Sequence, residues 1–128
     1  MTTEFQPIYQ CPPITGPIKP AAQLRWLLID DQSQALAKDD PDLQQVELSI
    51  RFDYLVIRAP GMLRLDIPVD VLEDDEDAFE SATVGSREIR VVSEGQLADA
   101  WFSKLLNRQV RLVKLHPDEN LVGAASAA

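Results

Sequence analysis

The sequence predicts a mainly β domain: a small antiparallel or mixed β-barrel with one C-terminal amphipathic helix. Several short segments alternate apolar and polar residues and are separated by turn residues at a spacing of about ten, as in small barrels. One segment near the C-terminal end instead has the apolar period of a helix. The 128 residues, 45% of them hydrophobic, suffice for the core of one domain. We expect that domain over residues 1–117 and a flexible tail over 118–128.

The N-terminal half contains the first expected strands. Residues 1–23 hold five of the nine prolines, which favours extended chain at a sheet edge or in a long loop. The apolar run 24–29 indicates a buried strand, followed by a turn and a short return strand over 35–37. Residues 43–51 and 54–59 follow as two further strands, the first with one wet face.

The C-terminal half continues this pattern and contains the helix. In the strand expected over 62–69, Leu63 and Leu65 share the apolar side. A hairpin follows over 82–92 around Gly85, and the last strand occupies 109–115. Between them, a capping box begins at Ser93, and the apolar side chains of the helix recur at four-residue spacing: Leu97, Trp101 and Leu105. We expect Asp99 to face solvent, Asn107 to end the helix in a left-handed conformation, and Trp26 and Trp101 to lie in the core.

The charge is acidic and uneven. The formal net charge is −9, and seven acidic residues with no base lie between Asp70 and Gly85. Such a run is typical of a solvated loop; a surface for a basic partner is the alternative, and the spacing of a calcium-binding loop is absent. The net charge is opposite to that of a generic nucleic-acid binder. No apolar run approaches the roughly 18 residues of a membrane span, and the N-terminal residues lack signal-peptide features, so we expect a cytoplasmic protein.

Few residues are candidates for chemistry. One cysteine and one histidine exclude a closed Cys/His zinc site, and no nucleophile elbow or glycine-rich phosphate loop occurs. We therefore expect neither catalytic nor metal-ligating residues. Cys11 is either a small core residue or, if a base lies near it, a reactive thiol. His116, at a strand end, is expected to be a surface or turn residue.

Basic residues alternate with apolar neighbours along the expected strands: Lys19, Arg25, Arg51, Arg58 and Arg64. The simplest interpretation is the wet face of a sheet. If several of them meet at one barrel mouth, their guanidinium groups can bind an anion such as phosphate or carboxylate.

The order of the segments resembles the MOSC N-terminal β-barrel domain family. The resemblance rests on Ile8-Tyr9, on Arg25-Trp26 with the following apolar residues, on Lys38 to Leu43, and on the C-terminal helix and strand, Ala100 to Leu106 and Val110 to Val113. It implies a barrel without a following MOSC domain. It also implies that Lys19, Arg25 and Lys38 bind an anion, with the molybdenum cofactor as a candidate ligand and Cys11 as a candidate sulfur carrier.

Two functions are compatible with these observations. The first is a non-catalytic binding or interaction module that works beside a MOSC-type or other enzyme, with no cofactor of its own. The alternative is an accessory protein that binds an anion or the molybdenum cofactor in cofactor or sulfur-transfer metabolism. A third interpretation is that the domain is a purely structural remnant that binds no ligand. Neither nucleic acid nor membrane is expected as a partner.

Overall fold

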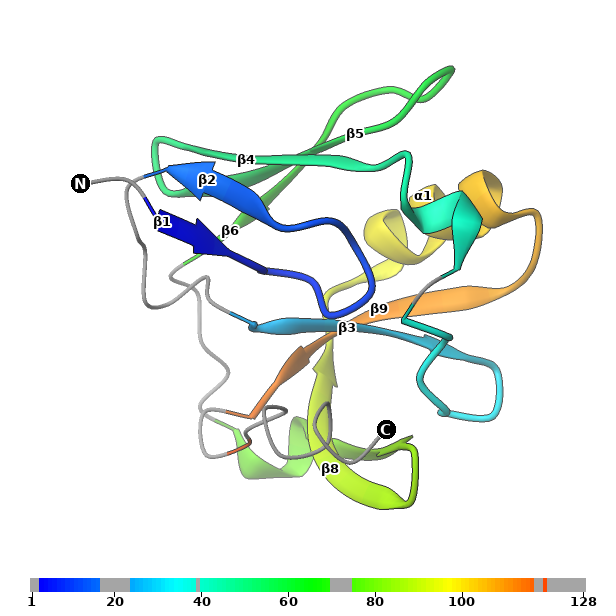
Figure 1. The fold of residues 1–128 in the computed structure, drawn as a ribbon. Helices are drawn as coiled ribbons and strands as arrows, with labels where there is room; N and C mark the ends of the chain where they lie inside the picture. Colours follow the sequence, from blue (N-terminus) through cyan, green and yellow to red (C-terminus); the bar gives the residue numbers. More distant parts are fainter. Residues whose placement is uncertain (1–2, 17–23, 39, 70–74, 117–118, 120–128) are drawn as a thin grey trace.

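The computed structural model describes residues 3–16, 24–38, 40–69, 75–116 and 119 (Figure 1). These residues form the strands β1 (Thr3–Phe5), β2 (Ile14–Gly16), β3 (Trp26–Asp30), β4 (Glu47–Arg51), β5 (Tyr54–Arg58), β6 (Leu65–Pro68), β7 (Glu80–Val84), β8 (Arg87–Ser93) and β9 (Val110–Leu115). They also form the helix α1 (Gln96–Leu106) and short 3-10 turns at Pro41–Leu43 and Glu76–Ala78. The predicted mainly β class with one C-terminal helix is confirmed.

The strands form three antiparallel sheets with the orders β1-β2, β3-β9-β8-β7 and β4-β5-β6. The four-stranded sheet curls beneath the three-stranded sheet, and α1 lies at one end of the space between them (Figure 1). The buried side of α1, which includes Trp101 and Phe102, packs into the core that both sheets share. The helix therefore covers one end of a half-closed barrel.

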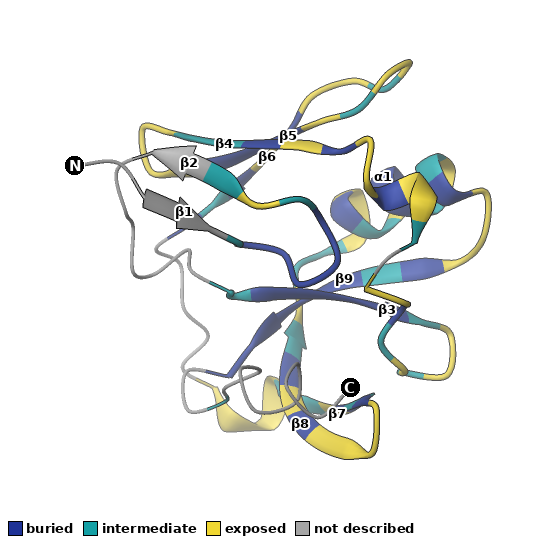
Figure 2. Cartoon of the chain, in the orientation of Figure 1, coloured by how far each residue is buried: buried dark blue, intermediate teal, exposed yellow. Residues whose placement is uncertain are grey.

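The core has two parts, on the two faces of β3 and β9. Trp26 and Leu28 point into the main cluster, whereas Leu27 and Ile29 belong to a second cluster against β7 and β8. All four of these side chains are fully buried (Figure 2). A strand buried on both faces has no wet side, which explains why this segment is a continuous apolar run rather than an alternating one.

Two expected strands are shorter than predicted. The strand expected from residue 43 begins at Glu47, because Pro41–Leu43 forms a 3-10 turn capped by Asp40, whose carboxylate accepts a hydrogen bond from the Asp42 N–H at 2.9 Å. The strand expected over 62–69 begins at Leu65. Its neighbour Leu63 is 87% exposed, since a loop over 59–64 replaces the first part of the strand. The predicted return strand over 35–37 is reduced to two isolated bridges, one between Ala35 and Ile29 and one between Gln34 and Thr83.

The helix begins two residues later than the capping box predicts. Gly95 is the N-cap residue, and the Ser93 hydroxyl accepts a hydrogen bond from the Gly95 N–H at 3.1 Å without capping the helix. Leu97 therefore lies 75% exposed rather than in the apolar stripe. Asp99 turns inward instead of outward, and its carboxylate accepts a hydrogen bond from the Leu112 N–H at 3.0 Å. Asn107 does take the left-handed conformation, with φ 54° and ψ 39°.

The acidic segment is described only from residue 75 onward. Glu76–Ala78 is exposed, as a solvated loop requires, but Glu80 forms a bidentate ion pair with Arg111, with N–O distances of 2.7 and 2.9 Å. That hydrogen-bonded guanidinium lowers the pKa of Glu80. Residues 70–74 lie outside the described part, as does all of the predicted tail except residue 119. Among the described residues, no helix is long and apolar enough to span a bilayer.

Candidate functional site

The outer face of the β4–β5 hairpin carries the polar side chains that alternate with the core residues. In its register, Arg51 lies opposite Tyr54, Ser49 opposite Val56 and Glu47 opposite Arg58. Directly opposed residues on antiparallel strands share a face, so these six side chains lie on one face of the hairpin, where Val56 is buried and its neighbours are more exposed. The intervening residues, such as Leu48 and Leu55, point into the main core. The alternation of apolar and polar residues thus determines which side chains face outward.

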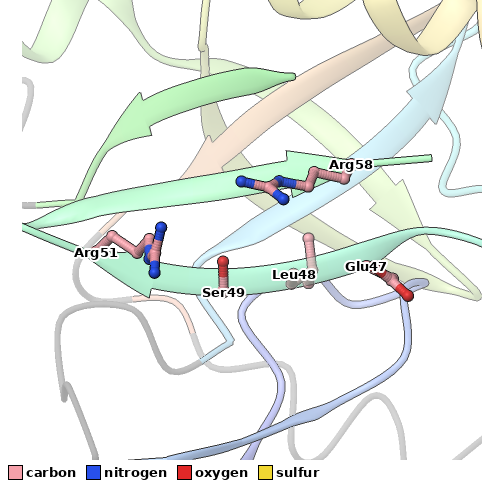
Figure 3. Close-up of a pocket in the computed structure, with 5 residues that line it drawn as sticks. All are labelled: Glu47, Leu48, Ser49, Arg51 and Arg58. Carbon is pink, nitrogen blue, oxygen red and sulfur yellow. The ribbon is translucent and has the colours of Figure 1, made fainter. Parts of the chain in front are cut away.

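A pocket of about 280 Å³ opens on this face and is lined by Glu47, Leu48, Ser49, Arg51 and Arg58. In Figure 3, the Arg51 and Arg58 side chains extend toward each other along the sheet, and the Ser49 hydroxyl lies between them. The Glu47 carboxylate points away from both guanidinium groups (Figure 3). We call Ser49, Arg51 and Arg58 the arginine pocket.

The two arginines of this pocket differ from their neighbour Arg64 in their pairing. Among the residues that the structure describes, neither the Arg51 nor the Arg58 side chain makes an ion pair or a hydrogen bond. Arg64, by contrast, pairs with Asp66 at 3.1 Å. Guanidinium groups present several N–H donors in a planar fork that fits carboxylate and phosphate oxygens. The arginine pocket therefore offers two such forks and a hydroxyl to one oxyanion.

The hairpin tip has an uncommon conformation. The two residues of the turn, Phe52 and Asp53, have φ values of 51° and 66°. Positive φ at both central residues defines a type I′ turn, in which Asn-Gly is the preferred pair. Phe52 is nonetheless an aromatic residue, and it is 95% exposed. The Asp53 carbonyl accepts a hydrogen bond from the Val69 N–H at 2.9 Å, which ties the turn to the end of β6.

Two of the three residues that the sequence predicts as an anion site lie near Tyr9. The Arg25 N–H donates to the Pro7 carbonyl at 2.9 Å, and the Tyr9 N–H donates to the Trp26 carbonyl, also at 2.9 Å. The Lys38 Nζ lies 5.2 Å from the centroid of the Tyr9 ring. Arg25 and Lys38 thus both contact the segment 7–9. Lys19, the third, lies outside the described residues.

Cys11 lies in the main core cluster and is 1% exposed. Burial raises the pKa of its thiol to about 12. The thiol is therefore held protonated at neutral pH, in an environment opposite to that of reactive cysteines. Its position is that of a small apolar core residue.

His116 is buried rather than at the surface, with 6% exposure. Its ring packs against Phe79 at a centroid distance of 4.6 Å, and its Nε2 lies 3.4 Å from a Glu76 carboxylate oxygen. His116 directly follows β9, where the sequence predicts a surface or turn position, but the exposed 3-10 turn at Glu76–Ala78 and the following Phe79 cover it.

A buried polar cluster joins β3, β9 and the segment before α1, and the sequence pattern does not reveal it. The Trp26 Nε1–H donates to a Glu94 carboxylate oxygen at 3.1 Å, and the Lys114 Nζ lies 3.6 Å from the same oxygen and 5.5 Å from the Trp26 ring centroid. Lys114 is only 4% exposed. Burial raises the pKa of Glu94, and the nearby ammonium group opposes that shift. The cluster satisfies its own polar atoms, which is typical of a structural network.

No group of three or more His, Cys, Asp or Glu side chains that could hold a metal ion occurs within the described residues. The arginine pocket is therefore the site whose chemistry is best defined by geometry. The sequence predicts Arg51 and Arg58 as part of the wet face of a sheet or, if several bases meet, of an anion site, but it does not single out this pair, because their proximity depends on the register between β4 and β5.

Comparison with known proteins agrees with this fold. The model of the MOSC N-terminal beta barrel domain family matches residues 16–109. The solution structure of a protein from Bordetella bronchiseptica superposes with a TM-score of 0.77 at 45% sequence identity, covering 92% of each chain. A search of curated proteins found no match. Since the family model spans most of the sequence, the chain belongs to the MOSC N-terminal β-barrel domain family.

Proposed function

We propose that this chain is a non-catalytic binding module that recognises an oxyanionic group of its ligand through the arginine pocket. The observation that carries the proposal is the pair of converging guanidinium groups, which make no ion pair with any residue that the structure describes. The two side chains best suited to covalent or acid–base chemistry are engaged elsewhere: the Cys11 thiol is buried and protonated, and the His116 ring is packed against Phe79.

The pocket matches an anion in charge and has room for one. Its volume of about 280 Å³ lies just below the range of roughly 300–1,000 Å³ that is usual for drug-sized ligands, so it suits a single oxyanionic group. Because both arginines are exposed, each contact with an anion contributes modestly, as surface ion pairs do. A Kd of about 1–10 mM for inorganic phosphate follows, which corresponds to roughly 3–4 kcal/mol.

An NMR titration with inorganic phosphate tests the proposal. The Nε–H resonances of the arginine side chains and the backbone amides of β4 and β5 are followed at constant ionic strength. We expect saturable shifts at Ser49, Arg51 and Arg58. In the double variant Arg51→Gln/Arg58→Gln these shifts should disappear and the Kd should rise at least tenfold.

Arg64→Gln is the matched control. It removes one positive charge from the loop just before β6 but leaves the arginine pocket intact, because Arg64 does not line the pocket and pairs with Asp66. Its phosphate Kd should stay within a factor of two of the wild-type value. If Arg64→Gln weakened phosphate binding as much as the double variant does, the binding would be a non-specific effect of charge, and the proposal would be refuted.

The partner in this proposal is a protein. A MOSC-type enzyme is the first candidate, since the chain belongs to the family of the MOSC N-terminal beta barrel domain. In this proposal the chain itself catalyses no reaction. A purified MOSC-type enzyme added to labelled chain should shift the amides of the β4–β5 hairpin; shifts confined to other elements would contradict this use of the pocket.

A second candidate is an accessory role in binding the molybdenum cofactor through Lys19, Arg25 and Lys38. It is favoured by the segment 7–9, which contacts both the backbone of Arg25, through the Pro7 carbonyl, and the side chain of Lys38, through the Tyr9 ring. Titration with a pterin phosphate separates the two candidates. Shifts at Arg25 and Lys38 would support cofactor binding there, whereas shifts at Arg51 and Arg58 alone would reject it.

A further inference from the structure

We infer that Phe52 and the arginine pocket form one composite site for a polypeptide segment in which a carboxylate side chain neighbours a large apolar side chain. The carboxylate would bind Arg51 and Arg58, and the apolar side chain would pack on Phe52. This inference rests on the proposed function and specifies the ligand class of the same site.

The first step is the conformation of Phe52. A bulky residue with positive φ is disfavoured because its Cβ crowds the backbone, and a type I′ turn is more stable with asparagine or glycine. Packing of the Phe52 side chain within the chain does not offset this strain, since 95% of its surface is exposed. A strained residue whose side chain contributes nothing to its own core points to a contact outside the chain.

The second step is the position of Phe52 relative to the pocket. It directly follows Arg51, and Tyr54, which is 45% exposed, lies opposite Arg51 in the register. The tip of the hairpin thus combines two exposed aromatic residues with Arg51, toward which the Arg58 side chain extends from the other end of the hairpin (Figure 3). Aromatic residues and arginine are the side chains that most often dominate the free energy of protein–protein binding.

The third step is the shape of the site. Small molecules bind in concave pockets that bury most of their surface. Here only the anion position is hollowed, whereas Phe52 is at the tip of a two-residue hairpin turn. A polypeptide can place one side chain in the pocket and the next across the tip, which a compact anion cannot do.

The fourth step is charge. The chain carries a formal charge of −9, but the lining of the arginine pocket brings two guanidinium groups, those of Arg51 and Arg58, against one carboxylate, that of Glu47. At physiological ionic strength, charges beyond about 8 Å are largely screened, so this local positive charge determines which partner binds here. It favours an acidic segment.

Three blocked dipeptides test the inference by NMR titration of the full chain. Acetyl-Phe-Glu-amide offers both groups, acetyl-Ala-Glu-amide offers the carboxylate alone, and acetyl-Phe-Gln-amide offers the ring alone. We expect the Kd of acetyl-Phe-Glu-amide to be at least threefold lower than that of either other peptide, with shifts at Arg51, Phe52, Tyr54 and Arg58.

Variants assign the gain to its source. Phe52→Ser and Phe52→Asn should both remove the advantage of acetyl-Phe-Glu-amide over acetyl-Ala-Glu-amide; the asparagine variant also guards against misfolding, because it suits the turn. Leu97→Ser, which removes another exposed apolar side chain, in this case from α1, should leave all three Kd values unchanged within a factor of 1.5.

The outcomes separate this inference from the function on which it rests. If both glutamate peptides bind at the arginine pocket with equal Kd, the composite site is refuted while anion recognition stands. If neither glutamate peptide shifts Arg51 or Arg58, both fail. Equal binding by acetyl-Phe-Gln-amide and acetyl-Phe-Glu-amide would show that the carboxylate has no role.

Discussion

Replacing Phe52 by asparagine should make this protein more stable although it deletes an aromatic ring. Phe52 has a φ of 51° and is 95% exposed, so the substitution removes conformational strain and almost no buried surface. A left-handed conformation disfavours ordinary L-residues by about 1–2 kcal/mol, and asparagine tolerates it far better. We expect a gain of about 1 kcal/mol in the free energy of unfolding, or roughly 4 °C in Tm for a chain of this length.

Urea denaturation monitored by tryptophan fluorescence measures this gain, because Trp26 and Trp101 are both buried. Phe52→Ala is the control: it deletes the ring but keeps a residue for which positive φ is unfavourable. Its stability should stay within about 0.5 kcal/mol of the wild type. If the asparagine variant is no more stable than the alanine variant, the turn is not strained and the argument from Phe52 fails.

Three further predictions concern other parts of the fold. Trp101→Phe should destabilise the chain by about 1 kcal/mol in urea denaturation, because its Nε1–H donates to the Leu63 carbonyl at 2.6 Å; no loss would show that this bond is replaced by water. Cys11 should resist a thiol reagent such as DTNB at pH 8 in the native state and react once urea unfolds the chain, since its pKa is raised to about 12; rapid native labelling would contradict its burial. Glu80→Gln should lower stability by less than about 1 kcal/mol at pH 7, because the pair with Arg111 is about one-third exposed. The pKa of Glu80 is lowered in the folded state, so its contribution is present above the ordinary value of 4.5 and is lost as the pH falls through the lowered pKa; a difference from wild type that persists at pH 2 would refute this assignment.

The elements that the sequence predicts well are those with a clear local pattern. The strand β4 follows its alternation, and α1 follows its apolar spacing from Trp101 to the left-handed Asn107. Local pattern alone suffices there because one face of each element is buried and the other is wet.

The features that the sequence does not predict depend on tertiary contacts. Lys114 looks like an outward residue of an alternating strand, but β9 is covered on both faces and Glu94 and Trp26 receive the ammonium group. Leu63 fits the alternation but lies in a loop, where its carbonyl accepts a hydrogen bond from the Trp101 Nε1–H. Arg51 and Arg58 extend toward each other because of the register between β4 and β5. That register is fixed by a turn that lacks the Asn-Gly signature.

The measurement that tests the account most directly is the phosphate titration of wild type, Arg64→Gln and Arg51→Gln/Arg58→Gln, read at the backbone amides of β4 and β5, which all three proteins share. Our account predicts saturable shifts at Arg51 and Arg58 in the wild type, unchanged when Arg64 is replaced, and none on the hairpin of the double variant. Identical titration curves for all three proteins would contradict it.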